Sequence, residues 1–169
     1  PRSFTYEIRE GTLMVFLVIR ARSDRGVTVK IRDTMAMLNL TRVNHATILP
    51  SAPSYLGMLN KAKDYITWGE VDSELIANLL KERGRMVGDK PVTDKSIKEN
   101  SKYSSVDKFA QALSAGEATL KDVKNLKPVL RLHPPRGSKG WGGIKRSYNV
   151  GGALGFRGEA IGDLVSRMI

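Results

Sequence analysis

The segment of residues 123–158 combines the residue types that an anionic polymer would attract. It contains eight Lys or Arg residues and no Asp or Glu, and eight of the chain's sixteen glycines lie between residues 137 and 158. Lysine and arginine neutralise phosphates, and glycine lets the backbone approach them closely. Trp141 and Tyr148 could stack on unpaired bases or on a ribose. The composition therefore indicates an RNA-binding ribbon.

Two other interpretations of this composition are weaker. The phosphate-binding loop of an NTPase and the dinucleotide-binding fingerprint both need glycines at a fixed spacing, which "GSKGWGG" lacks. The second alternative is a flexible loop whose aromatic residues merely cover the edge of the core. His133 lies between Arg131 and Arg136, whose charges oppose its protonated form, so we interpret it as a neutral hydrogen-bonding group. The candidate RNA-binding residues here are Arg131, His133, Arg136, Lys139, Trp141, Lys145, Arg146, Tyr148 and Arg157.

A second group of cations follows the first predicted strand. The loop "RARSDRG" leads into a predicted helix, whose positive N-terminal end also favours a phosphate. Asp24 and Asp33 partly neutralise this group, so a solvated helix face is an equally good interpretation. The candidates are Arg20, Arg22, Arg25, Lys30 and Arg32.

The residues offer little for catalysis or metal binding. The chain has no cysteine, only two histidines, and carboxylates that are dispersed or serve helix starts. His45 lies inside a predicted strand and is interpreted as a core residue. We therefore expect no metal, no cofactor and no enzymatic activity. The alternatives are an RNA-processing enzyme that uses the same basic surface, and a free RNA chaperone.

Charge and hydropathy narrow the class of protein. The formal net charge is +11 over 169 residues, yet residues 1–122 are nearly balanced, with 19 basic and 15 acidic side chains. The longest apolar run, residues 13–19, has the length of a strand and is too short to cross a bilayer. We expect a soluble cytoplasmic protein whose partner is nucleic acid rather than a membrane surface.

Hydrophobic periodicity predicts an α+β fold. Strands are predicted at residues 14–20, which read as a central strand, and at 43–49, with helices at 28–39 and 53–65. A third strand is predicted in "KPVLRLHPP". With the helices on one face, this order matches half of a split βαβ plan.

The remaining segments complete the predicted domain organisation. Helices are predicted at 72–84 and 104–116, with a helical turn or more in "VTDKSIKEN" and a last helix at 157–168. The chain divides into an amino-terminal arm (1–13), a core (14–70 and 127–136), a helical insertion (71–126), and the basic glycine-rich ribbon with the final helix (137–169).

Several motifs in fixed order resemble one known family. "RVNHATILPSAPSYLGMLNKAKDYITWGEV", "LLKERGRMVGDKPVTD", "KPVLRLHPPRG" and "NVGGALGFRGEAIGDLVSRM" are similar to the archaeal form of large-subunit ribosomal protein family thirty, whose eukaryotic counterpart is numbered seven. The resemblance runs from about Met14 to the end of the chain. It implies a ferredoxin-like core with a helical insertion and a carboxy-terminal extension, and a non-catalytic protein that binds rRNA.

The resemblance also implies partners and further site residues. The implied partners are large-subunit rRNA and neighbouring ribosomal proteins, with the small ribosomal RNA of that subunit as a further candidate. No membrane or small-molecule substrate is implied. The implied location is the ribosome in the cytoplasm. The motif "RxNxxxxLPxxPxxxGMxxKxK" is matched from Arg42 to Lys63. In this part of the chain we predict RNA contact for Arg42, Asn44, Ser54, Tyr55, Met58, Lys61 and Lys63. Residues 1–13 depart from the family pattern, and we assign no RNA contact to them.

Overall fold

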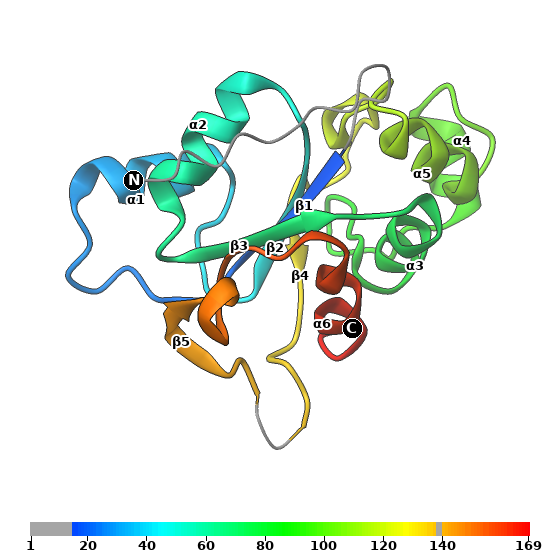
Figure 1. Cartoon of the computed structure of the whole chain (residues 1–169). Helices are drawn as coiled ribbons and strands as arrows, with labels where there is room; N and C mark the ends of the chain where they lie inside the picture. Colours follow the sequence, from blue (N-terminus) through cyan, green and yellow to red (C-terminus); the bar gives the residue numbers. More distant parts are fainter. Residues whose placement is uncertain (1–14, 138–139) are drawn as a thin grey trace.

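A computed structural model describes residues 15–137 and 140–169, which form a six-stranded mixed sheet with helices on both faces (Figure 1). The strands are β1 (Val15–Arg20), β2 (His45–Pro50), β3 (Ile66–Glu70), β4 (Leu130–Arg131), β5 (Gly143–Ser147) and β6 (Gly152–Phe156). The helices are α1 (Val29–Met37), α2 (Pro53–Ala62), α3 (Ser73–Arg83), α4 (Asp94–Asn100), α5 (Val106–Ser114) and α6 (Ile161–Ser166), with the 3₁₀ turns η1 (Leu120–Asp122), η2 (Tyr148–Val150) and η3 (Gly158–Ala160). Lys139 and the arm of residues 1–13 lie outside the described residues.

Strand β1 is the centre of the sheet, as its continuous apolar sequence predicts. The strand order is β4-β2-β1-β3-β6-β5, and all six residues of β1 are buried. Both β2 and β3 pair with β1 in antiparallel register, so they run parallel to each other. Helix α2 connects them, and β2, α2 and β3 therefore make a split βαβ unit with β1 between its strands.

The third strand of this core is not the predicted one. It is β3, whose sequence "ITWGE" follows directly after α2, at the place where we expected that helix to be ending. The predicted strand in "KPVLRLHPP" is reduced to the two residues of β4, at the edge of the sheet beside β2. The flanking prolines, Pro128 and Pro134, lack the N–H that a longer ladder needs.

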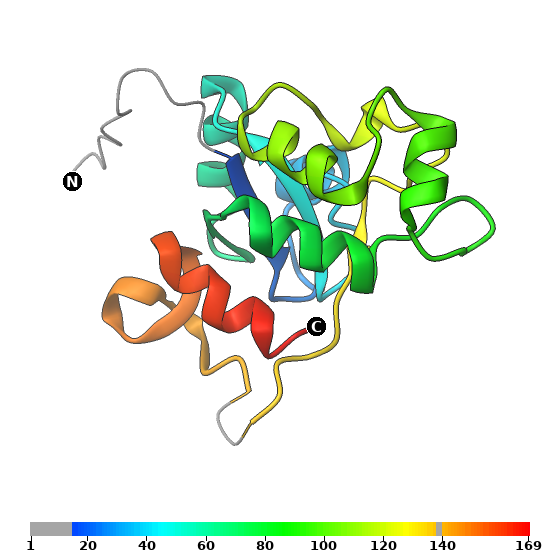
Figure 2. The same ribbon diagram turned by 90° about the vertical axis from the view of Figure 1, so that its right-hand side faces the viewer.

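The helices cover both faces of the sheet, and the two helices that connect the core strands, α1 and α2, lie on one face, as predicted. Helices α1 and α2 pack on the face that carries Phe16 and Val18. Helices α3, α5 and α6 pack on the opposite face, where Leu17 and Ile19 point. Figure 2 shows α6 beside α3 on this second face. The helices of the predicted insertion therefore share one hydrophobic core with the sheet.

The glycine-rich ribbon is divided between the sheet and the surface. Strand β6 pairs with β3 in parallel, and its Ala153 and Leu154 are buried. Every residue of β5, which pairs with β6, is exposed. We did not predict β6 from the sequence because its glycines weaken the hydrophobic pattern that is typical of a strand. The predicted last helix is shorter than expected, since η3 occupies its first turn.

Gly69 explains the "WG" motif by the close approach of two backbone segments. A Cβ atom at Gly69 would overlap the carbonyl oxygen of Gly158 and lie 2.8 Å from the Cβ of Ile161. Strand β3 can therefore contact η3 and α6 directly only because residue 69 has no side chain.

We expect Gly69→Ala to lower the free energy of unfolding by about 1 to 3 kcal/mol, because the added methyl group forces a backbone shift. Gly57→Ala is the matched control. Gly57 lies inside α2 with nothing within 4 Å of its added Cβ, so the same substitution should raise the free energy of unfolding by about 0.5 to 1 kcal/mol. Urea denaturation measures both, and equal effects of the two substitutions would contradict the packing argument.

Candidate nucleic-acid interface

The strand directions bring the connecting loops together at one end of the sheet. Because β2 and β3 both run antiparallel to β1, the end of β1 lies beside the starts of β2 and β3. In the register, Ile19 lies opposite Ala46, and Arg20 opposite Ile66. The loop after β1 therefore meets the loops that lead into β2 and β3. Helix α3 follows β3 and begins at the other end.

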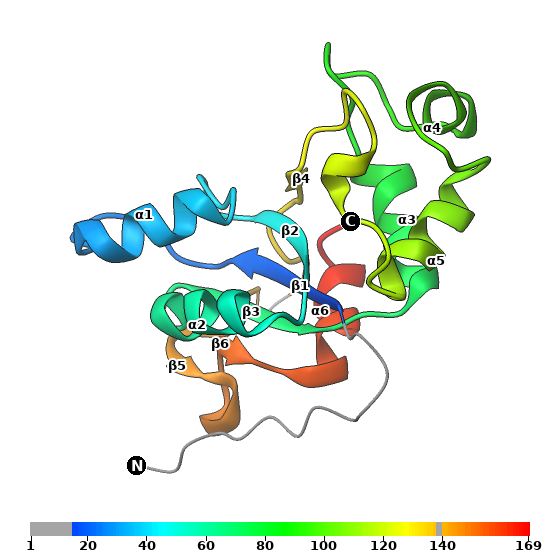
Figure 3. The ribbon, with the colours of Figure 1, turned by 90° about the horizontal axis from the view of Figure 1, so that it is seen from above.

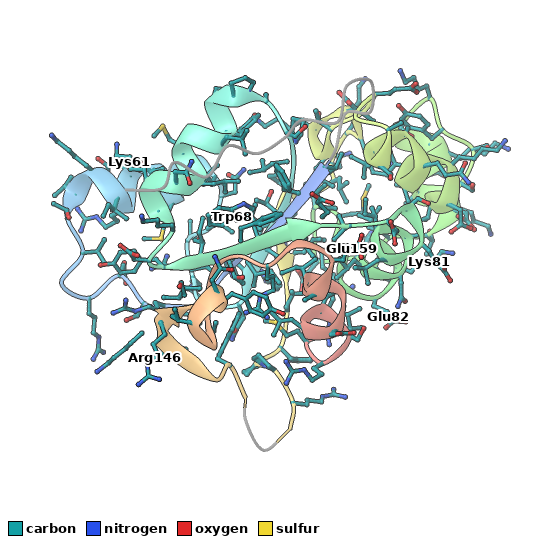
Figure 4. All side chains as sticks on the ribbon, viewed as in Figure 1. Lys61, Trp68, Lys81, Glu82, Arg146 and Glu159 are labelled. Carbon is teal, nitrogen blue, oxygen red and sulfur yellow. The ribbon has the colours of Figure 1, made fainter. Side chains whose placement is uncertain are left out.

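The cations of these loops, of the neighbouring helices and of strand β5 form a surface that we call the basic end. Its elements lie on the left in both Figure 1 and Figure 3, opposite helices α3 to α5. Figure 4 shows Lys61 and Arg146 on this side, and Lys81 and Glu82 on the other. The members of the basic end, all exposed or half-exposed, are Arg22, Arg25, Lys30, Arg32, Arg42, Lys61, Lys63, Lys145 and Arg146.

Ion pairs do not neutralise the cations of the basic end in the described part of the chain. Within residues 15–137 and 140–169, none of its nine cations lies within 4.0 Å of a carboxylate. On the opposite side, Lys81 pairs with Asp107 at 2.7 Å. An unneutralised group of cations produces a positive field that attracts a polyanion.

Arg20 belongs to the interior, although we predicted RNA contact for it. Its side chain is 3 % exposed; Nη1 donates to the carbonyl of Leu40 and Nε to that of Arg22, each at 2.8 Å. Burial lowers the pKa of the guanidinium, and the nearby carboxylate of Asp24, 3.7 Å from Nη2, opposes that change. Arg20 ties the start of the loop to the end of α1, so its donors are directed away from solvent.

Arg157 plays a similar structural part in the ribbon. Its Nε donates to Thr67 Oγ1 at 2.9 Å and its Nη2 to the carbonyl of Ala153 at 2.7 Å. The guanidinium also lies over the ring of Tyr148, 4.8 Å from the centroid. Burial is the main cause that lowers the pKa of Arg157. This side chain joins β3, β6 and η2, and its polar groups point into the fold.

Two other cations of the acid-free segment find a carboxylate that lies far away in the sequence. Asp89, in the loop between α3 and α4, accepts a hydrogen bond from Lys127 Nζ at 3.0 Å and lies 3.8 Å from Arg131 Nη1. The hydrogen bond from Lys127 is the main cause that lowers the pKa of Asp89. Arg131 remains exposed, but its charge is partly neutralised.

The entry to β2 shows why Asn44 and His45 occur where they do. Asn44 has a positive φ of 65°, which asparagine tolerates better than most residues. Its backbone N–H donates to Arg20, and its carbonyl accepts from Leu132. His45 is half-buried beside Thr41, whose hydroxyl lies 3.2 Å from Nδ1. Asn44 therefore shapes this turn through its backbone, and the half-burial of His45 agrees with its interpretation as a core residue.

The aromatic and apolar candidates are mostly half-buried. Trp141 packs against the core on the α3 face, which favours the interpretation that it covers the edge of the core. Tyr55 and Met58 also pack against the core, while Ser54 is exposed. Tyr148 is 39 % exposed.

His133 and Arg136 lie in the segment that runs along the end of α6. Their backbone N–H groups donate to the carbonyls of Met168 and Arg167. Both side chains are exposed.

Residues that we did not predict line a cavity in the basic end. Asn60 and Tyr65 come from α2 and the loop after it, Trp68 from β3, Ser147 from β5 and Asn149 from η2. The polar and aromatic composition of "DYITWG" and "RSYN" could have marked these residues as candidates for binding. Only the fold shows that the two segments lie together.

Comparison with known proteins identifies the family. The family model described as "Ribosomal protein L30p/L7e" matches residues 16–66, which run from β1 to the start of β3. "Large ribosomal subunit protein uL30" of Methanopyrus kandleri is 53% identical over 148 residues, covering 88% of this chain and 99% of that protein. The proteins of the same name from Methanobrevibacter smithii and Methanosphaera stadtmanae are 51% and 50% identical over 155 residues, covering 92% of this chain and 100% of each. The chain belongs to the ribosomal protein L30p/L7e family.

Membership of the L30p/L7e family confirms the resemblance and decides the question of catalysis. The family is one of non-enzymatic ribosomal proteins, so the alternative of an RNA-processing enzyme is excluded. Among the described residues, no cluster of three or more His, Asp or Glu side chains could hold a metal ion. A search of the same residues finds no helix with the length and apolarity that crossing a membrane requires.

His45 gives the fold a predictable dependence on pH. Burial is the largest cause that lowers its pKa, and the charges of Arg131, Arg42 and Arg20 act in the same direction. The unfolded chain therefore takes up this proton near pH 6.5, while the folded protein takes it up only at lower pH. Between the two values the unfolded state binds more protons.

We expect the free energy of unfolding to fall as the pH drops from about 6.5 towards the folded pKa of His45, and this part of the loss to disappear in His45→Gln. Urea denaturation of both proteins at about pH 7.5 and about pH 5 measures the difference. An identical pH dependence in the wild type and the variant would mean that His45 does not contribute.

Arg157 has a structural role and Arg146 is a surface cation, and this difference can be measured as a difference in the free energy of unfolding. Arg157→Met leaves Thr67 and the Ala153 carbonyl without their donor, so we expect a loss of about 2 kcal/mol in the free energy of unfolding. Arg146→Met, on the exposed strand of the same ribbon, should change it by less than about 0.5 kcal/mol. Urea denaturation measures both, and similar losses would show that Arg157 is no more structural than Arg146.

Proposed function

We propose that this protein is a structural component of the large ribosomal subunit and that its basic end binds rRNA there. The observation that carries the proposal is the group of nine exposed or half-exposed cations at one end of the sheet, none of which has a carboxylate partner among the described residues. The relatives that are about half identical are named as large-subunit proteins. The setting is then the ribosome in the cytoplasm.

The mechanism is electrostatic neutralisation with stacking at single positions. The nine cations of the basic end contact phosphates, and Arg136 and Lys139 extend this contact along the ribbon. Ser54 contacts the backbone of the RNA at the start of α2, while Tyr55, Met58 and His133 touch it with their accessible edges. Arg20 and Arg157 support the surface from inside, Asn44 holds the entry to β2, and Arg131 contributes only a part of its charge.

Partners and domain organisation follow from the same proposal. Large-subunit rRNA is the main partner, with the small ribosomal RNA of that subunit and neighbouring ribosomal proteins as further candidates. We retain the division into an arm (1–13), a core (14–70 and 127–136), a helical insertion (71–126) and a ribbon with the last helix (137–169). We class the core as ferredoxin-like on its split βαβ unit, and assign protein contacts to the insertion, whose ten basic and nine acidic side chains nearly balance.

Sedimentation of a lysate through a sucrose gradient tests the proposal directly. We expect the protein to co-migrate with the large subunit, and to remain with it at moderately high salt. A protein that stays at the top of the gradient at low salt would overturn the proposal. A protein that leaves the subunit at slightly raised salt would favour the free RNA chaperone.

The ribbon makes a quantitative prediction about salt. Each neutralised phosphate lowers the logarithm of the binding constant by about 0.7 to 0.9 per tenfold rise in salt. Changing Arg136, Lys145 and Arg146 together to Ala should therefore make the plot of the logarithm of the binding constant against the logarithm of the salt concentration less steep, by about two to three in slope. Filter binding of large-subunit rRNA over a salt series measures it.

A matched triple variant controls for the loss of net charge. Lys95, Lys98 and Lys108 are exposed on α4 and α5, away from the basic end. Changing these three to Ala removes the same charge and should leave the slope almost unchanged. If both triple variants lower the slope equally, the protein binds RNA through its net charge and the basic end has no special part.

A further inference from the structure

The basic end contains a cavity of about 540 Å³ between the end of α2, strand β3 and the ribbon. This volume lies in the range of sites that hold small molecules. The cavity is open to the surface of the nine cations, and its walls come from segments that are far apart in the sequence. Its chemistry therefore indicates what the basic end could hold beyond a phosphate backbone.

Positive charge dominates the walls of the cavity. Arg22, Lys63 and Lys145 line it together with one acidic residue, Asp64. Arg22 is held in place because its Nη1 donates to the backbone carbonyl of Asp64 at 3.1 Å. The three cations favour a ligand that carries a negative charge, such as a phosphate.

Two tyrosine rings in the walls are each held by a guanidinium. Arg22 lies over the ring of Tyr65 with 5.0 Å between its Cζ and the centroid, and Arg157 lies over Tyr148 at 4.8 Å. Each cation occupies one face of its ring, so stacking of a ligand is confined to the other face. Rings that are already fixed in this way lose little freedom when a flat ligand stacks on them.

Hydrogen-bonding groups complete the walls. Trp68 lines the cavity and is 2 % exposed, and its Nε1 donor has no partner among the described residues. A buried donor without an acceptor costs free energy, which a ligand oxygen or ring nitrogen would recover. The side-chain amides of Asn60 and Asn149 offer both donors and acceptors, as the edge of a nucleobase requires.

We infer that this cavity holds a single unpaired nucleotide of the rRNA, with its base inside and its phosphate among the three cations. The inference rests on the proposed function and makes it more specific. A base in a duplex is stacked and paired, so only an extruded base can enter. One base with its phosphate uses the aromatic, amide and cationic groups of the walls together.

Tryptophan fluorescence provides the test, because the chain has only two tryptophans. In Trp141→Phe the emission comes from Trp68 alone. We expect large-subunit rRNA from Methanobrevibacter smithii to change this emission, and a blunt RNA duplex to bind without changing it. Adenosine monophosphate at the same nucleotide concentration should have no effect.

The outcomes separate this inference from the proposed function. Emission that stays constant while the rRNA binds would overturn the cavity assignment and leave the proposed function standing. Failure of the wild-type protein to bind the rRNA would overturn both. An equal emission change with adenosine monophosphate would assign the cavity to a free nucleotide instead.

Substitutions test the same point by affinity. Ser147 lines the cavity, whereas Ile144, on the same exposed strand, does not. Ser147→Phe should block the cavity and weaken rRNA binding about 5- to 150-fold, the range for loss of one stacked base. Ile144→Phe should change it less than about twofold. Equal affinities of the two variants would overturn the inference.

A third variant tests the orphan donor alone. Trp68→Phe keeps an aromatic ring in place and removes Nε1, so we expect the affinity for the rRNA to fall about two- to tenfold. An unchanged affinity in a folded variant would show that Trp68 donates no hydrogen bond to the RNA. Circular dichroism shows whether Trp68→Phe is folded. If it is not, Ser147→Phe, on an exposed strand, still tests whether the RNA enters the cavity.

Discussion

The antiparallel pairing of β1 with both neighbours determines where this protein can bind. Since β1 pairs with both β2 and β3 in antiparallel register, these two strands must run in the same direction. Their entry loops then lie next to the exit loop of β1, whatever residues those loops contain. The cations of these loops and of the adjoining helices meet on one surface for this reason, and β5 adds Lys145 and Arg146 to it. Helix α3, which follows β3, begins at the opposite end.

Part of the positive charge is used inside the fold rather than on its surface. Arg20 and Arg157 are arginines whose guanidinium groups donate to backbone carbonyls at 2.7–2.8 Å. A guanidinium can satisfy several acceptors from one planar group, which a lysine cannot do. Asp89 also neutralises part of the charge of Lys127 and Arg131. The formal charge of +11 therefore overstates what RNA would meet.

The sequence predicts those parts of the fold that local pattern controls. The helices α1, α3 and α5 occur where apolar spacing places them. Of the three, only α5 has the expected side-chain cap, in which Ser105 accepts from Lys108 N. Strands β3 and β6 escaped prediction because each is short, contains glycine and is stabilised by pairing with distant segments. The candidate cations were identifiable by type, but their separation into exposed and structural groups depends on Asp89, Thr67 and Leu40, which are distant in sequence.

The same distant contacts hold strand β6 of the glycine-rich ribbon on the core. Thr67 Oγ1 donates to the carbonyl of Gly155 at 2.9 Å and accepts from Arg157 at the same distance, so β6 is attached to β3 by side chains as well as by its backbone. The exposed β5 strand is in turn supported by β6. A strand that is already held in this way loses less entropy on association. Gly152 allows a close approach to the backbone of Arg146, and Gly140, Gly142, Gly151 and Gly155 adopt positive φ values.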